Sequence, residues 1–398
     1  MLASLEAGET RFFGAIFDPT HLNRPKELRD EVISRRLDAI LDPRTQPSAT
    51  IGGYNDALGS LPWGAGRPHT ISDFQGPLQL RRTIGALGDF AADNGFTAVL
   101  APSHFILSAN DPWLSTDLAS VRFLRNHLDK KAGLQIPIFY SLAISAKVAR
   151  DKEQREAIIY ALKDLPISAL WLKIDRFGSN FSPTATTTTY LEALRDFHSL
   201  GLPIIGDCVG GLIGLSILAF GSVGGLAHGI TNGEQFNSYA WLRPKTTGKG
   251  FSPAKRVYIP AIGMLLDVTQ ATVLIEGSPR TRALFGCANP KCCPRGVIDM
   301  LQNPGRHFIC QRAEEVAHLG QIPNEIRIQR FLDQHIRSAT DKALSVANMK
   351  WVSPKMTRKT QEHRKWLDNL RIALGNHASD KPQETFATVP LTRVAREG

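Results

Sequence analysis

The sequence predicts an α/β fold: a (β/α)8 TIM-type barrel, a C-terminal zinc-binding subdomain and a basic helical tail. From about residue 69, short apolar runs alternate with longer amphipathic segments, the pattern of repeated βα units in a parallel sheet. No G-x-G-x-x-G sequence follows the first run, so a barrel is favoured over an open doubly wound sheet. Four of the five cysteines lie between residues 287 and 310, which indicates a compact metal-binding unit late in the chain.

The apolar runs and the helical periodicity predict the elements in order. Strands are expected at residues 69–72, 97–103, 136–144, 169–174, 203–207 and 224–228. Helices are expected at 78–94, 115–131, 152–165, 186–200 and 212–220, where apolar residues recur every three or four positions. Ser115, Thr116 and Asp117 offer side-chain oxygen atoms that can cap the second of these helices.

Changes in composition divide the chain into four expected parts. These are an irregular N-terminal segment covering the barrel at 1–68, the barrel at 69–280, a zinc-binding helical subdomain at 281–349 and a basic tail at 350–398. Within the barrel, residues 232–256 are rich in Gly, Lys, Thr and Pro without clear periodicity. We interpret them as an excursion that forms a candidate substrate loop.

Length and composition indicate a folded globular protein, since 42% of the 398 residues are hydrophobic. The first residues lack a basic segment followed by an apolar run, and no stretch is apolar over the length of a membrane span. We therefore expect a cytoplasmic protein without membrane contact. The few cysteines, mostly in one cluster, suit a reducing compartment better than a disulfide framework. The sequence leaves open whether the chain forms a homodimer or joins a partner subunit.

The clustered cysteines and a histidine predict a structural Zn2+ site. Thiolates and an imidazole can converge on a tetrahedral ion when a tight turn carries some of them and an adjoining helix supplies the rest. The first-choice ligands are Cys287, Cys292, Cys293 and His307, with Cys310 or His318 as a substitute for the fourth. Cys292 and Cys293 can bind one ion only if the backbone between them is kinked. The alternative is a set of buried thiols without a metal.

Polar residues at the carboxyl ends of the strands are candidate active-site residues, because the active sites of parallel barrels lie at this end. The candidate catalytic residues are Asp73, Asp175, Asp207 and His228. The candidate substrate-binding residues are His104, Arg176, Gly206, Gly224 and Gly225. Carboxylates at several strand ends suit general acid–base work or covalent attack on an electrophilic carbon. Each residue alone also has a structural alternative, such as an ion pair between Asp175 and Arg176 or a tight turn at a glycine.

The formal charge of +10 favours a polyanionic partner, DNA or RNA, although a basic surface also suits solubility alone. Residues 350–365 concentrate basic side chains, with Trp351 near their start and Trp366 directly after them. Cations and aromatic rings together can hold phosphates and stack bases. The candidate nucleic-acid contacts are Arg358, Lys359, Arg364 and Lys365. The alternative is a solvated helix face.

The order of these elements resembles the tRNA-guanine transglycosylase superfamily over roughly residues 69–346. The segment Ser-Asp-Phe-Gln-Gly at 72–76 looks like a variant of that family's Asp-Ser-Gly-Gly-Phe-Gln segment, and the cysteines with a downstream histidine resemble its three-cysteine, one-histidine zinc site. The resemblance implies a barrel that replaces guanine by a 7-deazaguanine, with Asp73 as the acid/base aspartate that contacts the base. A purine or 7-deazapurine base would be the second substrate.

The chain also departs from that family. Residues 226–228 lack a carboxylate where the family has its nucleophilic aspartate, and residues 103–104 end a strand that carries a guanine-reading aspartate in the family. The cysteine spacing differs as well. Either the nucleophile is Asp207 or Asp175, or His228 has taken over a role, or the chain is not a transglycosylase. The basic tail and the excursion suit the divergent branch that inserts 7-deazaguanine bases into DNA.

We therefore expect a base-exchange transglycosylase acting on nucleic acid, with DNA favoured over tRNA. An aspartate would attack C1′ of a guanosine nucleotide whose base has left the stack. Moving the base out of the stack costs a few kcal/mol. Two alternatives stay open. One is a catalytically inactive, zinc-containing barrel that binds nucleic acid, and the other is an unrelated barrel lyase or aldolase on a small anionic substrate with Lys173 as a Schiff-base residue.

Overall fold

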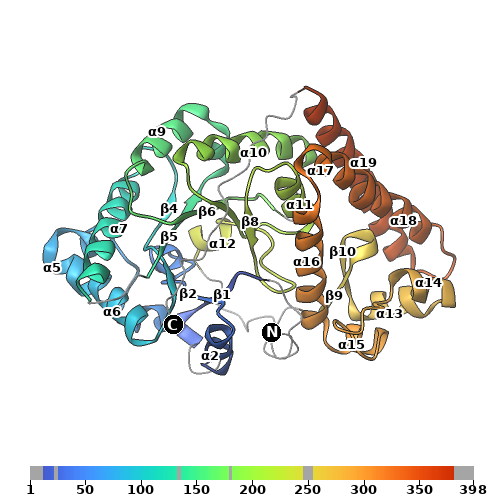
Figure 1. The fold of residues 1–398 in the computed structure, drawn as a ribbon, viewed down its shortest axis with the longest axis horizontal. Helices are drawn as coiled ribbons and strands as arrows, with labels where there is room; N and C mark the ends of the chain where they lie inside the picture. Colours follow the sequence, from blue (N-terminus) through green and yellow to red (C-terminus); the bar gives the residue numbers. More distant parts are fainter. Residues whose placement is uncertain (1–11, 22–25, 132–135, 179–181, 245–253, 381–398) are drawn as a thin grey trace.

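Parallel strands form the centre of the molecule. The computed structural model describes residues 12–21, 26–131, 136–178, 182–244 and 254–380. In this part of the chain the strand order is β1-β2-β3-β5-β6-β7-β8 with parallel neighbours throughout, and β4 (Phe105–Ile106) pairs with β5 beside this path. The sheet curls into a half-barrel with β1 and β8 at the two ends of its path, and helices surround it (Figure 1).

The strands of this sheet are β1 (Gly14–Phe17), β2 (Asp38–Leu41), β3 (Ala98–Leu100), β5 (Ile138–Ile144), β6 (Ala169–Ile174), β7 (Ile204–Asp207) and β8 (Gly225–Ala227). The strands predicted from residue 97 onward are confirmed to within a few residues. The prediction of an irregular segment over 1–68 is wrong, because β1 and β2 lie in it and begin the sheet. Each has only four residues, too few for a strand periodicity to stand out from its surroundings.

The predicted strand at 69–72 is also wrong. Residues Ile71–Phe74 form a 3-10 turn, η2, whose buried residue is Phe74. The backbone N–H and the hydroxyl of Thr70 donate to Asp73 Oδ2 at 2.8 and 3.0 Å. Short polar side chains that bind the nearby backbone favour such turns over strands.

Helices follow the strands and cover the outer face of the sheet. They include α2 (Lys26–Ser34), α5 (Gly76–Leu80), α6 (Ala86–Asp93), α7 (Pro112–Lys130), α9 (Lys152–Leu162), α10 (Thr184–Asp196) and α11 (Gly211–Ala219). The predicted cap at residues 115–117 is wrong, because α7 begins earlier, at Pro112. The Asp111 side chain caps it by accepting a hydrogen bond from the Trp113 N–H at 3.0 Å.

Alternate residues of each strand point to the inner and the outer face of the half-barrel. The inner face carries a small apolar cluster of Ile40, Ala98, Leu100, Phe139, Ala169, Trp171, Ile205 and Ala227. The residues between them join the large core beneath the helices. Two positions further along β5, β6 and β7, the same face carries Ser141, Lys173 and Asp207. The interior therefore changes from apolar to polar toward the carboxyl ends of the strands.

A helical unit with a hairpin follows the sheet. Its elements are β9 (Arg256–Ile259), β10 (Met264–Asp267), α13 (Val268–Glu276), α14 (Pro279–Phe285), α15 (Val297–Gln302) and α16 (Pro304–Gln321). The strands β9 and β10 are antiparallel to each other. Helix α16 packs against both β9 and α11, so this unit is joined directly to the half-barrel (Figure 1).

The last described helices are α17 (Asn324–Arg330), α18 (Ser338–Ala347) and α19 (Pro354–Asp380). Helix α19 packs on α18 and α10. Its buried residues recur every three or four positions, at Met356, Thr360, His363, Leu367, Leu370, Leu374 and His377. The described part of the expected basic tail is therefore a packed helix, and residues 381–398 lie outside the described residues. Among the described helices, none is long and apolar enough to cross a membrane.

Candidate active site and metal centre

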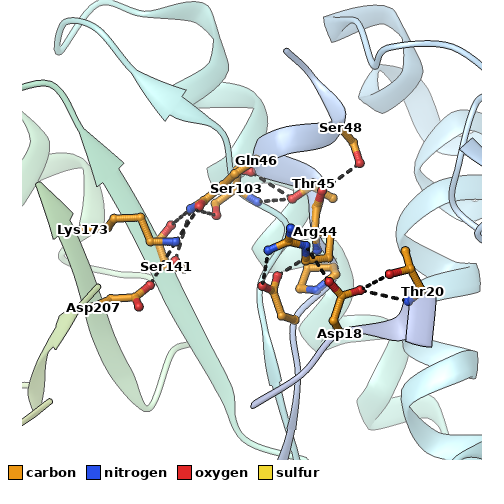
Figure 2. A network of polar contacts seen from close by, with 12 residues as sticks. Asp18, Thr20, Arg44, Thr45, Gln46, Ser48, Ser103, Ser141, Lys173 and Asp207 are labelled. Carbon is orange, nitrogen blue, oxygen red and sulfur yellow. Dashed lines mark hydrogen bonds and ion pairs between the residues drawn. The ribbon is translucent and has the colours of Figure 1, made fainter. Parts of the chain in front are cut away.

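Polar side chains at the carboxyl ends of the inner face form one connected network (Figure 2). Lys173 Nζ on β6 lies 3.1 Å from Asp207 Oδ2 on β7 and donates to Gln46 Oε1 at 3.0 Å. The Gln46 side-chain nitrogen donates to the Ser103 hydroxyl at 3.0 Å and to the Ser141 carbonyl at 2.9 Å. The side chains of Lys173 and Asp207 are only 12% and 8% exposed, so this ion pair is largely shielded from water.

A second ionic group lies at the ends of β1 and β2. Arg44 Nε lies 3.1 Å from Asp18 Oδ2, and the Arg44 backbone N–H donates to Asp42 Oδ1 at 2.8 Å. Arg44 has a φ of 58°, in the left-handed region that is uncommon for a non-glycine residue. The side chains of Asp18, Asp42 and Arg44 are partly exposed. We call these two groups together the mouth network; Figure 2 shows them side by side.

Burial and the neighbouring charges have opposite effects on the pKa of Lys173. Burial alone would lower its pKa, but the carboxylate of Asp207 and weaker effects of neighbouring groups raise the pKa of Lys173 above its ordinary value. Lys173 is therefore an ammonium group at neutral pH. Burial and the nearby Asp207 also raise the pKa of the Cys208 thiol to about 12, so this thiol is a weak nucleophile.

Residues 234–243, which we call the cap segment, contact the mouth network at Lys173. The rings of Phe236 and Trp241 are centred 5.7 and 6.0 Å from Lys173 Nζ. Phe236 also packs edge-on against Phe105, the first residue of β4. The cap segment thus places aromatic surface beside the buried ammonium group.

Two hydrogen bonds tie the cap segment to the half-barrel. The Ser238 N–H donates to Asp175 Oδ1 at 2.7 Å, just beyond the end of β6. The Gly52 N–H donates to the Trp241 carbonyl at 2.8 Å. A Cβ atom at Gly52 would lie 2.0 Å from the Arg243 carbonyl oxygen, so glycine is needed for this close approach. The segment is therefore held at both its middle and its far end.

The candidate catalytic aspartates bind different partners in the structure. Asp207 belongs to the mouth network, whereas Asp175 binds the cap segment and lies 3.7 Å from Arg176 Nε. Asp73 accepts two hydrogen bonds from Arg67, at 2.7 and 2.8 Å. Partial burial raises the pKa of Asp73. The hydrogen bonds from Arg67 and from Thr70 in the neighbouring turn lower it by more, so the pKa of Asp73 is about 2. Within the described residues, no hydrogen bond or ion pair joins Asp73 to the other candidates.

His228 and Arg176 have different surroundings. His228 follows β8, and its Nδ1 lies 3.0 Å from the Gly229 carbonyl oxygen, while its ring meets Phe308 edge-on. Burial lowers the pKa of His228, so the ring is neutral at pH 7. Arg176 has a left-handed backbone with a φ of 60°, and its side chain is 69% exposed. It is available to an anionic ligand approaching the mouth.

The candidate glycines have packing roles. A Cβ atom at Gly206 would lie 2.7 Å from Val209 Cγ1, and one at Gly225 would lie 2.9 Å from Ile205 Cδ1. These distances are shorter than ordinary carbon contacts, so a larger residue at Gly206 would displace several core side chains, whereas one at Gly225 would require only the end of Ile205 to move. Gly224 is exposed, and its N–H pairs with the Ile204 carbonyl at 2.8 Å.

His104 is buried beneath the outer helices. Its Nδ1 lies 2.6 Å from Asp117 Oδ1, and its ring stacks on Trp113 with 3.6 Å between the centroids. Burial raises the pKa of Asp117, and the hydrogen bonds from His104 limit that rise. Because both side chains are inaccessible, their contacts hold α7 against the strands.

The four first-choice metal ligands come together. The ligand atoms of Cys287, Cys292, Cys293 and His307 all lie within 4.8 Å of one another. His307 Nδ1 is 3.4 Å from Cys292 Sγ and 3.6 Å from Cys293 Sγ. Three thiolates and one imidazole suit tetrahedral Zn2+, so this group, the Cys3His centre, could hold a metal ion. A cavity of about 250 Å3 borders Cys287 and His307.

A kinked turn allows the two adjacent cysteines to face one point. The Asn289 side chain accepts a hydrogen bond from the Lys291 N–H at 2.9 Å, and the Cys293 N–H donates to the Asn289 carbonyl at 2.8 Å. Gly296 completes the turn with a φ of 62°. The backbone kink that Cys292 and Cys293 need in order to bind one ion is therefore present.

Neighbouring groups orient and polarise the ligands. His307 Nε2 lies 2.9 Å from the Tyr258 carbonyl oxygen, which leaves Nδ1 to face the sulfur atoms. Hydrogen bonds from Cys292 and Cys293 hold the pKa of Cys287 well below its usual range. Cys310 and His318, the two substitutes for the fourth ligand, are not part of the Cys3His centre among the described residues. The His318 ring packs near His335, and Cys310 is buried on α16.

The basic residues of α19 fall into two groups. Arg358 and Lys365 are exposed, and Arg358 pairs with Glu362 in the same helix. Lys359 donates to the Leu265 carbonyl at 3.3 Å, and burial lowers its pKa. Arg364 is half-buried, 3.7 Å from Asp368. Trp366 donates to the Ser182 carbonyl, so it packs α19 onto the barrel and is not free to stack on a base.

Comparison with known proteins gives no family for this chain. No protein-family model matches it, and no curated protein sequence matches it. The resemblance to the transglycosylase superfamily therefore stays a prediction from sequence and enters below as a proposal.

The mouth network contains residues that the sequence prediction missed. Asp18 and Asp42 each follow an apolar run and precede a proline, in Phe-Asp-Pro and Leu-Asp-Pro. An apolar run that ends in Asp-Pro twice is a usable signal for two strand ends, because the residue before proline is extended and proline stops the strand. Gln46 and Ser141 carry no such signal, since they depend on contacts between distant segments.

Proposed function

We propose that the mouth network is an active site that exchanges a base on nucleic acid. In this reaction a guanosine nucleotide loses guanine and receives a 7-deazaguanine. The observation that supports this proposal is the carboxylate of Asp207 beside the Lys173 ammonium at the carboxyl ends of β6 and β7, together with Asp18 and Asp42 around Arg44 at the ends of β1 and β2. Active sites of parallel α/β barrels lie at this end.

Asp207 is the proposed nucleophile. Base exchange needs a carboxylate that can attack C1′, and the Asp207 carboxylate lies at the end of β7, 3.1 Å from the Lys173 ammonium. As the bond from Asp207 to C1′ forms, the C1′–N9 bond breaks and the leaving guanine accepts a proton. The incoming deazaguanine loses a proton and displaces Asp207 by the reverse step.

Asp42 is the proposed acid and base for these proton transfers. It lies at the partly exposed side of the mouth network, where a departing base can reach both a carboxylate and water. The rings of Phe236 and Trp241 offer flat apolar surface to an extruded base. Zn2+ at the Cys3His centre would hold the helical unit in shape and supply no step of the exchange.

The rival lyase or aldolase chemistry is less favoured. A Schiff-base lysine must be neutral to attack a carbonyl, so its pKa is usually lowered by its surroundings. Asp207 instead raises the pKa of Lys173. This electrostatic setting supports an ion-pair role for Lys173 beside the nucleophile.

Incorporation of labelled guanine or 7-deazaguanine tests the proposal, with duplex DNA first and tRNA as the second substrate. We expect incorporation into DNA and its loss in Asp207→Asn. Asp73→Asn is the matched control, because Asp73 pairs with Arg67 and the proposed chemistry does not use it. No incorporation into either polymer, or full activity of Asp207→Asn, would contradict the proposal. Loss of activity only in Asp73→Asn would restore the role that the family resemblance implies.

A further inference from the structure

We propose that the Cys3His centre and the cap segment are energetically coupled, and that Arg312 is the positioning residue between them. Arg312 lies on α16, the helix that also carries His307. Its side chain is 8% exposed and contacts both the hairpin beside the metal centre and the first residue of the cap segment. The coupling concerns the position of the cap segment and does not depend on which reaction the mouth performs.

On the metal side, Tyr258 connects Arg312 to His307. The Tyr258 carbonyl oxygen lies 2.9 Å from His307 Nε2, and the Tyr258 hydroxyl accepts a hydrogen bond from Arg312 Nη1 at 3.0 Å. The guanidinium also lies 4.3 Å from the centre of the Tyr258 ring. Glu315 accepts from both side chains, at 2.8 and 2.7 Å. The position of Arg312 therefore depends on the same backbone that orients a metal ligand.

On the barrel side, Arg312 holds Glu234. Arg312 Nη2 donates to Glu234 Oε1 at 2.9 Å, and the same oxygen accepts the Gly211 N–H at 2.9 Å. The Gly210 N–H donates to the Glu234 carbonyl at 3.1 Å. Glu234 thus joins the cap segment to the start of α11, shortly after Asp207.

Burial makes this connection sensitive to small shifts of α16. The carboxylate of Glu234 is 10% exposed, so it needs the guanidinium as a partner. Metal binding fixes α16 and the hairpin, which places Arg312 against Glu234. Without the metal, the cap segment keeps its bonds to Asp175 and Gly52 but loses the support of a fixed Arg312. By linkage, a ligand that orders the cap segment also raises the affinity for the metal.

Amide hydrogen exchange of the full chain, with zinc added or removed by a chelator, tests the coupling. We expect zinc to slow exchange in residues 208–211 and 234–238 by about tenfold relative to β5 and β6, which serve as the internal reference. In Arg312→Met, zinc should still bind with unchanged stoichiometry, but this selective slowing should disappear. Arg312→Lys should restore only part of it, because an ammonium lacks the planar fork of donors.

Arg155→Met is the matched control, because Arg155 is equally buried and pairs with Asp196 at 2.6 Å on the outer helices. It should keep the zinc-dependent slowing. The coupling is refuted if Arg312→Met shows the same selective slowing as the parent, or if zinc slows exchange uniformly, including β5 and β6. If Arg312→Met does not fold, Glu234→Gln provides the same comparison, since it weakens the charged contact from the other side.

Discussion

The Cys3His centre and the mouth network each bring together several reactive or charged side chains, but the chain assembles the two groups in different ways. The ligands of the metal centre lie within one segment, from Cys287 to His307, and one turn and one helix position them. The mouth network combines side chains from the ends of β1, β2, β6 and β7, which are separated by long stretches of sequence. The first site is encoded locally, whereas the second depends on the curvature of the whole sheet.

This difference has an energetic consequence. Metal binding adds to the free energy of folding. It also neutralises the deprotonated thiolates, which would otherwise repel one another. The mouth network has to be stabilised by its own ion pairs and by the strands beneath it. Loss of a ligand should therefore destabilise the metal centre most. Removal of one member of an ion pair should destabilise the mouth network most.

The largest expected effect comes from removing a metal ligand. Cys292→Ser should lower the free energy of unfolding by an amount on the order of 5 kcal/mol and abolish tight zinc binding, because the remaining ligands cannot complete a tetrahedral site. Cys208→Ser is the matched control, since Cys208 lies outside the Cys3His group and should retain zinc. Metal analysis and thermal unfolding measure both. Absence of zinc from the parent protein would show that the cluster is a set of buried thiols, and equal zinc content in the two variants would show that Cys292 is not a required ligand.

The ease of predicting each region from sequence follows the same division. The sequence predicts the grouping of Cys287, Cys292, Cys293 and His307 because they share one segment, and the structure confirms that they come together. Five of the eight strands described in the parallel sheet were also predicted, and the longest of them, β5 and β6, are mostly apolar runs. The four-residue strands β1 and β2 were missed, and Asp18 and Asp42 were missed with them. Asp73 was proposed from a motif, yet Thr70 and Arg67 use its carboxylate in a turn.

A smaller but still large effect is expected for Lys173→Met. The substitution leaves the buried carboxylate of Asp207 without its positive partner, which should cost about 3 kcal/mol of stability. The double variant Lys173→Met/Asp207→Leu should recover part of this loss, because it removes the unpaired charge as well. Chemical denaturation of the four proteins in the cycle measures the coupling. Additive effects would mean that the ion pair does not organise the mouth.

Asp73→Asn should have a modest, pH-dependent effect. The folded pKa of about 2 lies below the ordinary value of 3.8, so ionised Asp73 stabilises the fold above that ordinary value. We expect a loss of about 1 kcal/mol at neutral pH, reduced because Arg67 is 52% exposed. The difference from the parent should shrink as the pH falls from about 4 to about 2. A constant difference over this range would contradict a role based on charge.

The smallest effect on stability is expected on α19, where exposure separates two kinds of basic residue. Arg358 and Lys365 are exposed, so replacing both by Ala should leave the melting temperature unchanged, whereas Lys359→Ala should lower it by removing the bond to the Leu265 carbonyl. If α19 contacts DNA, the double variant should flatten the dependence of log K on log salt by about 1.8, because each lost phosphate contact removes about 0.9. Binding measured across a salt series decides this. An unchanged slope would assign α19 to packing and leave the mouth, with exposed Arg176, as the surface that meets a polyanion.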